Sequence, residues 1–323
     1  MKLYTEVDIE ALDKKITYKD NILFVGSCFA QNIGQKFQNY KYNAMVNPTG
    51  ILYNPISIAT SFYNALNQKN YQASQLHEKD YFFSFDFHSS FATSSAEESL
   101  SLMHKGLKSL EKQCHEAEFI FITFGTAWIY ELDGEVVANC HKTPISEFTR
   151  RRISVNEIID VWSKLIERLC LINKKVEIIF TVSPIRHWKD GANENQLSKS
   201  TLLLAIDEIV KCFNNVQYFP AYEILIDELR DYRFYKEDMI HPNALAVDYI
   251  WNKIKFFALS PDTLIWHPKW ENLLKQINHQ PKDSKSLKHM EFLKSLLKKL
   301  EDFQLQSQIN VNQEIQEVRQ RLF

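Results

Sequence analysis

The sequence predicts an α/β fold in which helices cover both faces of a parallel sheet. Four short runs rich in Ile, Val and Phe are apolar throughout, which is typical of strands buried on both faces. Helical patterns separate these runs along the chain, and such alternation of strand and helix favours a parallel sheet. The pattern leaves one alternative open, an α+β arrangement in which some strands pair antiparallel.

The expected elements follow one another through the first two thirds of the chain. The apolar runs predict strands over residues 21–25, 118–124, 175–182 and 216–219, with a weaker fifth strand over 42–46. The apolar periodicity predicts helices over residues 30–40, 55–66, 96–114, 155–171 and 199–213. Arg150, Arg151 and Arg152 form a basic run that we expect to open the fourth helix on a solvated surface.

Residues 81–88 have a different pattern, with aromatic and polar side chains in alternation. Tyr81, Phe83, Phe85 and Phe87 would share one face of an extended strand. We expect an inserted hairpin, either as a lid over a site or as a simple surface hairpin.

The chain changes character after residue 255, which predicts an α/β domain over residues 1–255 and a helical extension over residues 256–323. In the extension, Met290, Leu293, Leu297 and Leu300 recur at steps of three and four residues and form one apolar stripe. The stripe suits packing on the chain's own domain, self-association with a second copy, or contact with a membrane surface.

Composition excludes several classes of function. The 323 residues carry 38 basic and 40 acidic side chains, a net charge of −2, so we expect no nucleic-acid partner. No apolar run is long enough for a transmembrane segment. Five scattered cysteines without CxxC spacing, and no signal-peptide pattern, favour the reducing cytoplasm. Only 7 glycines are present, and neither GxGxxG nor a Walker sequence occurs, so we expect no cofactor.

The end of the first strand carries the strongest local signal for a site. Gly26 and Ser27 end this strand and open directly into a helix. Crevices of open α/β sheets lie at the carboxyl edge of the strands, and helix N-termini offer unpaired N–H groups there. Ser27 is therefore a candidate nucleophile, and the alternative is that it only caps the helix.

A second signal follows the last expected strand. Asp238 and His241 stand three residues apart on one loop, with Pro242 suited to the first helical position. A carboxylate on imidazole Nδ1 fixes the tautomer and leaves Nε2 free to accept a proton from a hydroxyl. The position of the loop allows it to fold back beside Ser27.

Several segments together carry a family resemblance over about residues 20–255. They are Gly26-Ser27-Cys28-Phe29-Ala30, Asn47-Pro48-Thr49-Gly50, Phe124-Gly125-Thr126-Ala127-Trp128, Asn139-Cys140-His141-Lys142, Ser183-Pro184-Ile185-Arg186-His187 and Asp238-Met239-Ile240-His241-Pro242. In this order they resemble the GSCFA family, which is similar to the SGNH (GDSL-type) hydrolases. The resemblance implies a three-layer α/β/α, flavodoxin-like parallel sheet, with the C-terminal extension outside the matched part.

The resemblance also implies roles for single residues. Ser27 matches the SGNH nucleophile, Asp238 the orienting acid and His241 the general base. The oxyanion hole would take the N–H groups of Ser27 and Gly50. The superfamily's third donor, an asparagine, is absent from its block, so the Thr126 hydroxyl or Asn139 would have to replace it.

Other residues after the strands compete for roles in the site. Cys28 is an alternative nucleophile, or a buried thiol. Asn139, His141, Arg186 and His187 are candidate substrate-binding residues, and Arg186 could grip a carboxylate or phosphate or form a structural ion pair. The histidines lack HxH or HExxH spacing, so we expect no metal site.

The sequence therefore predicts a serine-dependent esterase that forms an acyl-enzyme on Ser27. The resemblance favours a small-molecule or carbohydrate O-acyl ester as substrate, with deacetylation as one example. Two alternatives remain, an O-acyltransferase that uses the same triad, and a non-catalytic module that binds glycans or a protein.

Overall fold

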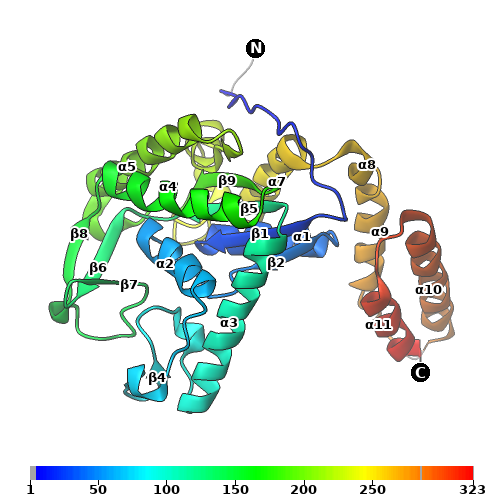
Figure 1. The fold of residues 1–323 in the computed structure, drawn as a ribbon. Helices are drawn as coiled ribbons and strands as arrows, with labels where there is room; N and C mark the ends of the chain where they lie inside the picture. Colours follow the sequence, from blue (N-terminus) through cyan, green and yellow to red (C-terminus); the bar gives the residue numbers. More distant parts are fainter. Residues whose placement is uncertain (1–4, 284–285, 323) are drawn as a thin grey trace.

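A five-stranded parallel sheet forms the centre of the computed structural model, which describes residues 5–283 and 286–322 (Figure 1). Its strands are β1 (Asn21–Gly26), β2 (Asn43–Val46), β5 (Phe119–Phe124), β9 (Glu177–Val182) and β10 (Val216–Tyr218). They lie in the order β10-β9-β5-β1-β2, and every neighbouring pair is parallel. The five expected strands and their parallel pairing are confirmed.

Helices cover both faces of this sheet, so the three-layer α/β/α prediction is also confirmed. One face carries α2 (Pro55–Leu66), α3 (Ala96–Glu116), α4 (Val155–Ile172) and α5 (Gly191–Cys212), and the other carries α1 (Cys28–Asn39) and α7 (Ala244–Ala258). Within β1, Leu23 and Val25 point into the first core while Ile22 and Phe24 point into the second. This division explains why the central strands are apolar without alternation.

Helix α5 begins eight residues earlier than the sequence indicates. Its polar first turns resemble a loop, but two of their side chains are buried hydrogen-bond acceptors. The Oδ1 of Asn195 accepts from the His187 N–H at 2.9 Å, and the Oγ of Ser198 accepts from the Ala127 N–H at 2.8 Å. The start of α5 thus holds two of the loops that follow the strands.

A second, antiparallel sheet has no counterpart among the expected elements. Its strands are β6 (Trp128–Leu132), β7 (Glu135–Val137) and β8 (Thr149–Arg152), in the order β7-β6-β8. Asp133 and Gly134 join the first two with positive φ angles of 52° and 84°. An Asp-Gly pair between strand-like residues is a hairpin signal that would have found this sheet.

The basic run lies in strand β8 and does not open a helix, so that expectation is wrong. Arg150 pairs with Asp190, Arg151 with Glu131 and Glu157, and Arg152 with Glu194. All three guanidinium groups thus have carboxylate partners within the chain.

Residues 81–88 do not form one extended strand, which corrects a second expectation. Only β4 (Phe82–Phe83) is a strand, and it pairs with β3 (His77–Glu78). The chain then curls around His141, whose Nε2 lies 3.1 Å from the carbonyl oxygens of both Ser84 and Phe87. Hydrogen bonding to this imidazole favours a curled backbone over a longer hairpin.

The C-terminal helices pack around a core of their own, beside the α/β part in Figure 1. They are α9 (His267–Ile277), α10 (Leu287–Ser307) and α11 (Asn312–Leu322), whereas Leu264 of the preceding helix α8 (Pro261–Leu264) packs on the core of α1 and α7. The buried stripe of α10 consists of Leu293, Leu296, Leu300 and Phe303, whereas Met290 and Leu297 are only half-buried. The stripe packs on α9 and α11 of the same chain, and self-association through this helix stays a prediction.

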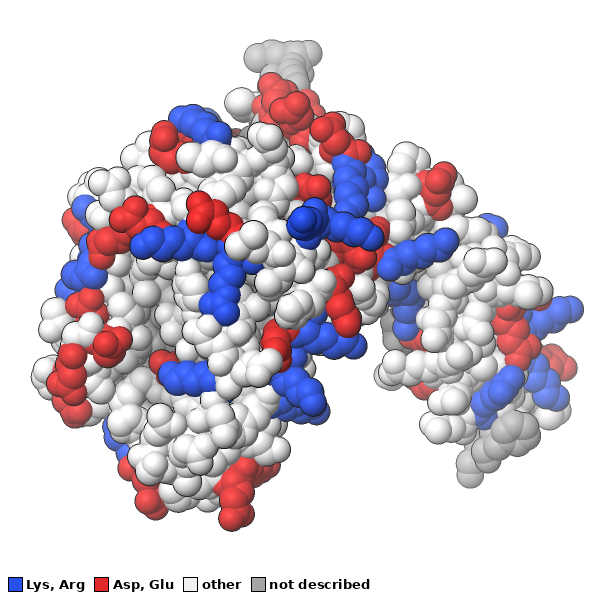
Figure 2. Space-filling model, viewed as in Figure 1, with Lys and Arg blue, Asp and Glu red and all other residues white. Residues whose placement is uncertain are grey.

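Two surface properties bear on the expected partners. Within the described residues, no helix combines the length and apolar character that crossing a membrane requires. Figure 2 shows acidic and basic side chains interspersed on the face in view, with no large area of one sign.

Candidate active site

The strand order puts the end of β1 at the point where the sheet changes its direction of winding. β1 lies between β2, the next strand along the chain, and β5, which follows α2 and α3. Open α/β sheets bind ligands at such a switch point, outside the carboxyl ends of the strands. Ser27 is the first residue after β1 and therefore lies at this point.

Ser27 is held by a turn that only glycine permits. Gly26 has a φ of 136°, and a Cβ there would lie 2.2 Å from the Thr123 carbonyl oxygen. Ser27 is 1 % exposed and caps α1, because its Oγ accepts from the Phe29 N–H at 3.2 Å. The cap uses a lone pair of the hydroxyl and leaves its proton free for a base. Capping and nucleophilic attack are therefore compatible roles.

The loop before α7 brings Asp238 and His241 into direct contact. One carboxylate oxygen of Asp238 accepts from the N–H groups of Ile240 and His241, each at 2.9 Å. The other lies 2.6 Å from His241 Nδ1. These bonds, the backbone N–H of His241 first, lower the pKa of Asp238 to about 2. A carboxylate that stays ionised at neutral pH keeps the Nδ1 proton of His241 in place.

The loop is tightly turned where it carries this pair. Met239 has a φ of 58°, a left-handed conformation that is unfavourable for a non-glycine side chain. Such strain is typical of functional loops. Pro242 does not open α7, because the helix begins at Ala244 with Asn243 as its cap, and this corrects a further expectation.

A cavity of about 200 Å³ joins the two parts of the site. Its lining comprises Ser27, Cys28, Tyr53, Ser183, Ile185, Arg186, His187, Trp188, Lys189, Ile240 and His241. The structure thus brings together the candidate nucleophile, the candidate base and two of the four candidate substrate-binding residues.

The remaining candidates lie outside this lining. The Gly50 N–H donates to the Asn47 carbonyl at 2.8 Å, and Gly50 packs against His88. The Thr126 hydroxyl pairs with Ser198 at 3.1 Å. Two of the three expected oxyanion donors, Gly50 and Thr126, therefore have other partners.

Asn139 and His141 also serve the local structure. The Oδ1 of Asn139 accepts from the His141 N–H at 2.8 Å, and the ring of His141 stacks on Phe83 at 4.3 Å between ring centroids. These two residues hold the β3–β4 hairpin, and no residue of 81–88 lines the cavity.

Nothing in the sequence indicated Tyr53, which lines the cavity, or Lys199, which contacts the cavity residue Ser183. The Tyr53 hydroxyl lies 3.3 Å from Cys28 Sγ, and burial raises the pKa of this tyrosine. Lys199 is 1 % exposed, and its Nζ lies 2.7 Å from the carbonyl oxygens of Gly125 and Ser183. Burial lowers the pKa of Lys199 to about 7. A lysine in a polar stretch gives no sign in the sequence that it is buried.

Arg186 and His187 both line the cavity, but their surroundings differ. Burial, with the nearby charges of Lys199 and His241, lowers the pKa of His187 to about 4, so its ring is neutral at pH 7. The guanidinium of Arg186 lies 5.5 Å over the ring of Trp188, and its buried Nε has no hydrogen-bond partner.

Among the described residues, no cluster of three or more His, Cys, Asp or Glu side chains could hold a metal ion.

Fold and site together define a three-layer α/β/α protein with a Ser, His and Asp set at the switch point of a flavodoxin-like sheet. The chain belongs to the GSCFA family, whose sequence model matches residues 21–254. A second model, described as the C-terminal domain of GSCFA domain proteins, matches residues 270–322. The resemblance found from the sequence is confirmed.

Comparison with other proteins adds little about the reaction. No curated protein matches the chain. One similar solved structure is the acetyl xylan esterase Est2A from the rumen bacterium Butyrivibrio proteoclasticus, with 15 % sequence identity and a TM-score of 0.30. The match covers 75 % of this chain and 66 %, just under two thirds, of that one.

Proposed function

We propose that the protein is a serine-dependent esterase that cleaves O-acyl esters through an acyl-enzyme on Ser27. One observation carries the proposal: Ser27 and His241 line the same cavity, and Asp238 lies 2.6 Å from Nδ1 of that histidine. Nucleophile, base and orienting acid are the groups that acyl transfer through serine requires.

In the first step, His241 accepts the hydroxyl proton of Ser27 on Nε2, and Oγ forms a bond to the ester carbonyl carbon. The ion pair with Asp238 stabilises the imidazolium that results. When the tetrahedral intermediate collapses, the bond to the alcohol oxygen breaks and His241 returns the proton to that oxygen. The acyl group stays on Ser27.

The best oxyanion donor in the cavity is the backbone N–H of Cys28. This first residue of α1 lines the cavity, and its N–H makes no hydrogen bond within the described part of the chain. The Ser27 N–H is weaker, because it is shared with the Thr123 carbonyl at 3.3 Å. The N-terminal end of the α1 dipole adds to the stabilisation of negative charge.

Deacylation uses the same groups in reverse. His241 takes a proton from water, the water oxygen attacks the acyl carbon, and Ser27 leaves with the proton returned to Oγ. If a second alcohol replaces water, the enzyme is an O-acyltransferase with the same triad. The resemblance to SGNH hydrolases supports a carbohydrate ester as the substrate class.

Hydrolysis of phenyl acetate by matched variants tests this mechanism. Ser27→Ala and Ser27→Gly should both lose at least about 10³-fold in kcat/KM. Alanine should lower the free energy of unfolding by about 1 kcal/mol through the lost cap, whereas glycine should lower it by only a few tenths. Loss of activity in both variants then separates chemistry from helix capping. Cys28→Ala tests the alternative nucleophile: it removes the thiol but keeps the backbone N–H, so hydrolysis through Ser27 should survive.

A fluorophosphonate probe distinguishes the remaining alternatives. The esterase is labelled at Ser27, and labelling disappears in Ser27→Ala. An unlabelled wild-type protein that still binds acetylated glycans would be a non-catalytic module and would contradict the proposal. Ester hydrolysis that is lost in Cys28→Ala and kept in Ser27→Ala would make the thiol the nucleophile. Hydrolysis that accelerates when a sugar acceptor is added would identify the transferase.

A further inference from the structure

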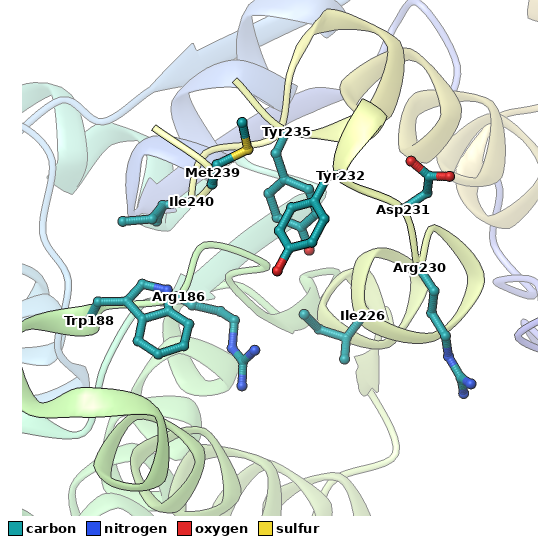
Figure 3. A pocket seen from close by; sticks show the side chains of 9 residues that line it. All are labelled: Arg186, Trp188, Ile226, Arg230, Asp231, Tyr232, Tyr235, Met239 and Ile240. Atoms are coloured by element: carbon teal, nitrogen blue, oxygen red, sulfur yellow. The ribbon is translucent and has the colours of Figure 1, made fainter. Parts of the chain in front are cut away.

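A second cavity adjoins the one that contains Ser27. Its volume is about 250 Å³, and it shares Arg186, Trp188 and Ile240 with the first (Figure 3). Its remaining lining is Ile226, Arg230, Asp231, Tyr232, Tyr235 and Met239. Ligand pockets usually span about 300–1,000 Å³, so each cavity is small alone and the pair reaches that range.

Arg186 is the cation at the junction of the two cavities. Within the described residues it forms no ion pair, unlike Arg150, Arg151 and Arg152 of β8. Its guanidinium extends into the second cavity between Trp188 and Ile226 (Figure 3). A guanidinium without a carboxylate, at the edge of a cavity, is suited to an anionic ligand.

The other charged groups of this cavity point away from its centre. Arg230 pairs with Asp227 at 3.0 Å, and a carboxylate oxygen of Asp231 accepts from the Arg233 N–H at 2.8 Å. In Figure 3 the side chains of Arg230 and Asp231 extend away from Arg186. Arg186 is therefore the charge that a ligand in the centre meets.

Aromatic rings supply the walls. Trp188 is 47 % exposed and Tyr232 is 75 % exposed, although both are large rings that packing would normally bury. The Tyr232 hydroxyl points towards Arg186, with the ring of Tyr235 beside it (Figure 3). Trp and Tyr combine an apolar face with a polar tip, which suits a ring that carries hydroxyl groups.

We propose that the second cavity binds a uronate, a sugar ring whose carboxylate is held by Arg186. The inference rests on the proposed esterase and names its substrate class: the acyl carbonyl lies beside Ser27, and the uronate belongs to the alcohol part of the ester. The ring stacks on Trp188 or Tyr232, and the guanidinium fork donates two N–H groups to the carboxylate oxygens.

Calorimetric titration tests this assignment without any need for turnover. The Ser27→Ala protein is titrated with methyl glucuronoside and with methyl glucoside, which differ only at C6, a carboxylate in the first and a hydroxymethyl group in the second. The glucuronoside should bind at least about 10-fold more tightly, as expected for a charge-assisted contact. Adding Arg186→Gln should bring the ratio to about 1, and Arg186→Lys should restore part of it because the charge returns without the fork.

Arg230→Gln is the matched control, because it removes a rim cation that already has a carboxylate partner. This variant should keep the full ratio. Equal binding of both sugars, or a ratio that falls as far in Arg230→Gln as in Arg186→Gln, overturns the inference. Glucose 6-phosphate binding more tightly than the glucuronoside also overturns it, in favour of a phosphate site.

Failure of this inference differs from failure of the proposed function. An enzyme that hydrolyses phenyl acetate through Ser27 but does not prefer the uronate retains the function and loses the subsite. A protein that binds the uronate through Arg186 but hydrolyses no ester retains the subsite and loses the function.

Discussion

The Nζ of Lys199 lies 2.7 Å from the carbonyl oxygen of Ser183, at the end of β9. The same nitrogen lies 2.7 Å from the carbonyl oxygen of Gly125, at the end of β5. One buried amino group therefore connects the loops that leave two neighbouring strands. Ser183 lines the cavity of the proposed active site, so this contact with a buried side chain helps to hold the cavity wall in place.

Removal of this amino group should destabilise the protein. Lys199→Met leaves two buried carbonyl oxygens without donors, and each such loss costs about 1–3 kcal/mol. We expect the free energy of unfolding to fall by about 2–5 kcal/mol, measured by urea denaturation. Lys199→Gln retains a donor for one carbonyl and should lose roughly half as much. A Met variant as stable as wild type would show that the two bonds contribute nothing net.

Asp238→Asn separates the two roles of this side chain. An amide oxygen can still accept from the N–H groups of Ile240 and His241, so the loop should keep its shape, and the melting temperature should fall only slightly because the negative charge is lost. The amide nitrogen cannot accept from Nδ1 of His241, so the wrong tautomer is favoured and kcat should fall. Because both side chains are over 40 % exposed, we expect the lower part of the usual range, about 10²–10³-fold.

Asp238→Ala is the comparison for this experiment. It removes the loop hydrogen bonds as well and should lower both kcat and the melting temperature. Phenyl acetate kinetics and thermal denaturation report the two effects. Unchanged kcat in the Asn variant would exclude Asp238 from the mechanism.

Acid should weaken the fold between about pH 6.5 and pH 4. His187 has a pKa of about 4 in the folded protein, against an ordinary value of 6.5, because burial disfavours the charged ring. The unfolded chain therefore binds more protons in this range, and stability falls as the pH falls. Burial lowers the pKa of His267 to about 4 too, so both histidines contribute.

Urea denaturation at several pH values measures this dependence. His187→Gln and His267→Gln should each make the decline of stability between pH 6.5 and pH 4 shallower, and the double variant should make it shallower still. A double variant with the slope of the wild type would contradict the assignment.

A core substitution in the C-terminal helices should leave ester hydrolysis intact. Leu300 is fully buried in the core of α9–α11, so Leu300→Ala should cost about 2–5 kcal/mol. Leu305 lies on the same helix and is 81 % exposed, so Leu305→Ala is the matched control and should cost almost nothing. We expect a separate, earlier unfolding transition in Leu300→Ala by calorimetry, with phenyl acetate kinetics unchanged below it. A single transition would argue against two parts with the boundary near residue 255.

The central sheet could be predicted because its three inner strands, β1, β5 and β9, are buried on both faces. The residues of β5, Phe119–Phe124, are apolar on both faces of the strand, so the strand is stable only where both faces are covered by other elements. The antiparallel sheet was missed because its strands carry charge: β8 is Thr149–Arg152 and contains three arginines. Those charges are satisfied by carboxylates far along the chain, such as Asp190, which a local pattern cannot reveal.

Part of the candidate site could be predicted from where its residues stand relative to the strands in the sequence. Ser27 ends the first strand and His241 follows the last, so the topology of a parallel sheet brings both to one edge. Gly50 and Thr126 have the same kind of position, but local hydrogen bonds to Asn47 and Ser198 engage them. The place of a residue after a strand therefore predicts the edge of the sheet at which it lies. Which of these residues face the cavity depends on the hydrogen-bond partners of their polar groups.

Helix α1 connects the two parts of the molecule. Ser27 caps its first turn, and at its other end the Asn39 carbonyl accepts from Trp270 Nε1 at 2.7 Å. Lys41, just beyond, pairs with Glu314 of α11. The twelve residues of α1 form a rod on the order of 18 Å long, since each residue adds about 1.5 Å. The C-terminal helices are therefore attached to the far end of the same helix whose first turn is capped by the candidate nucleophile.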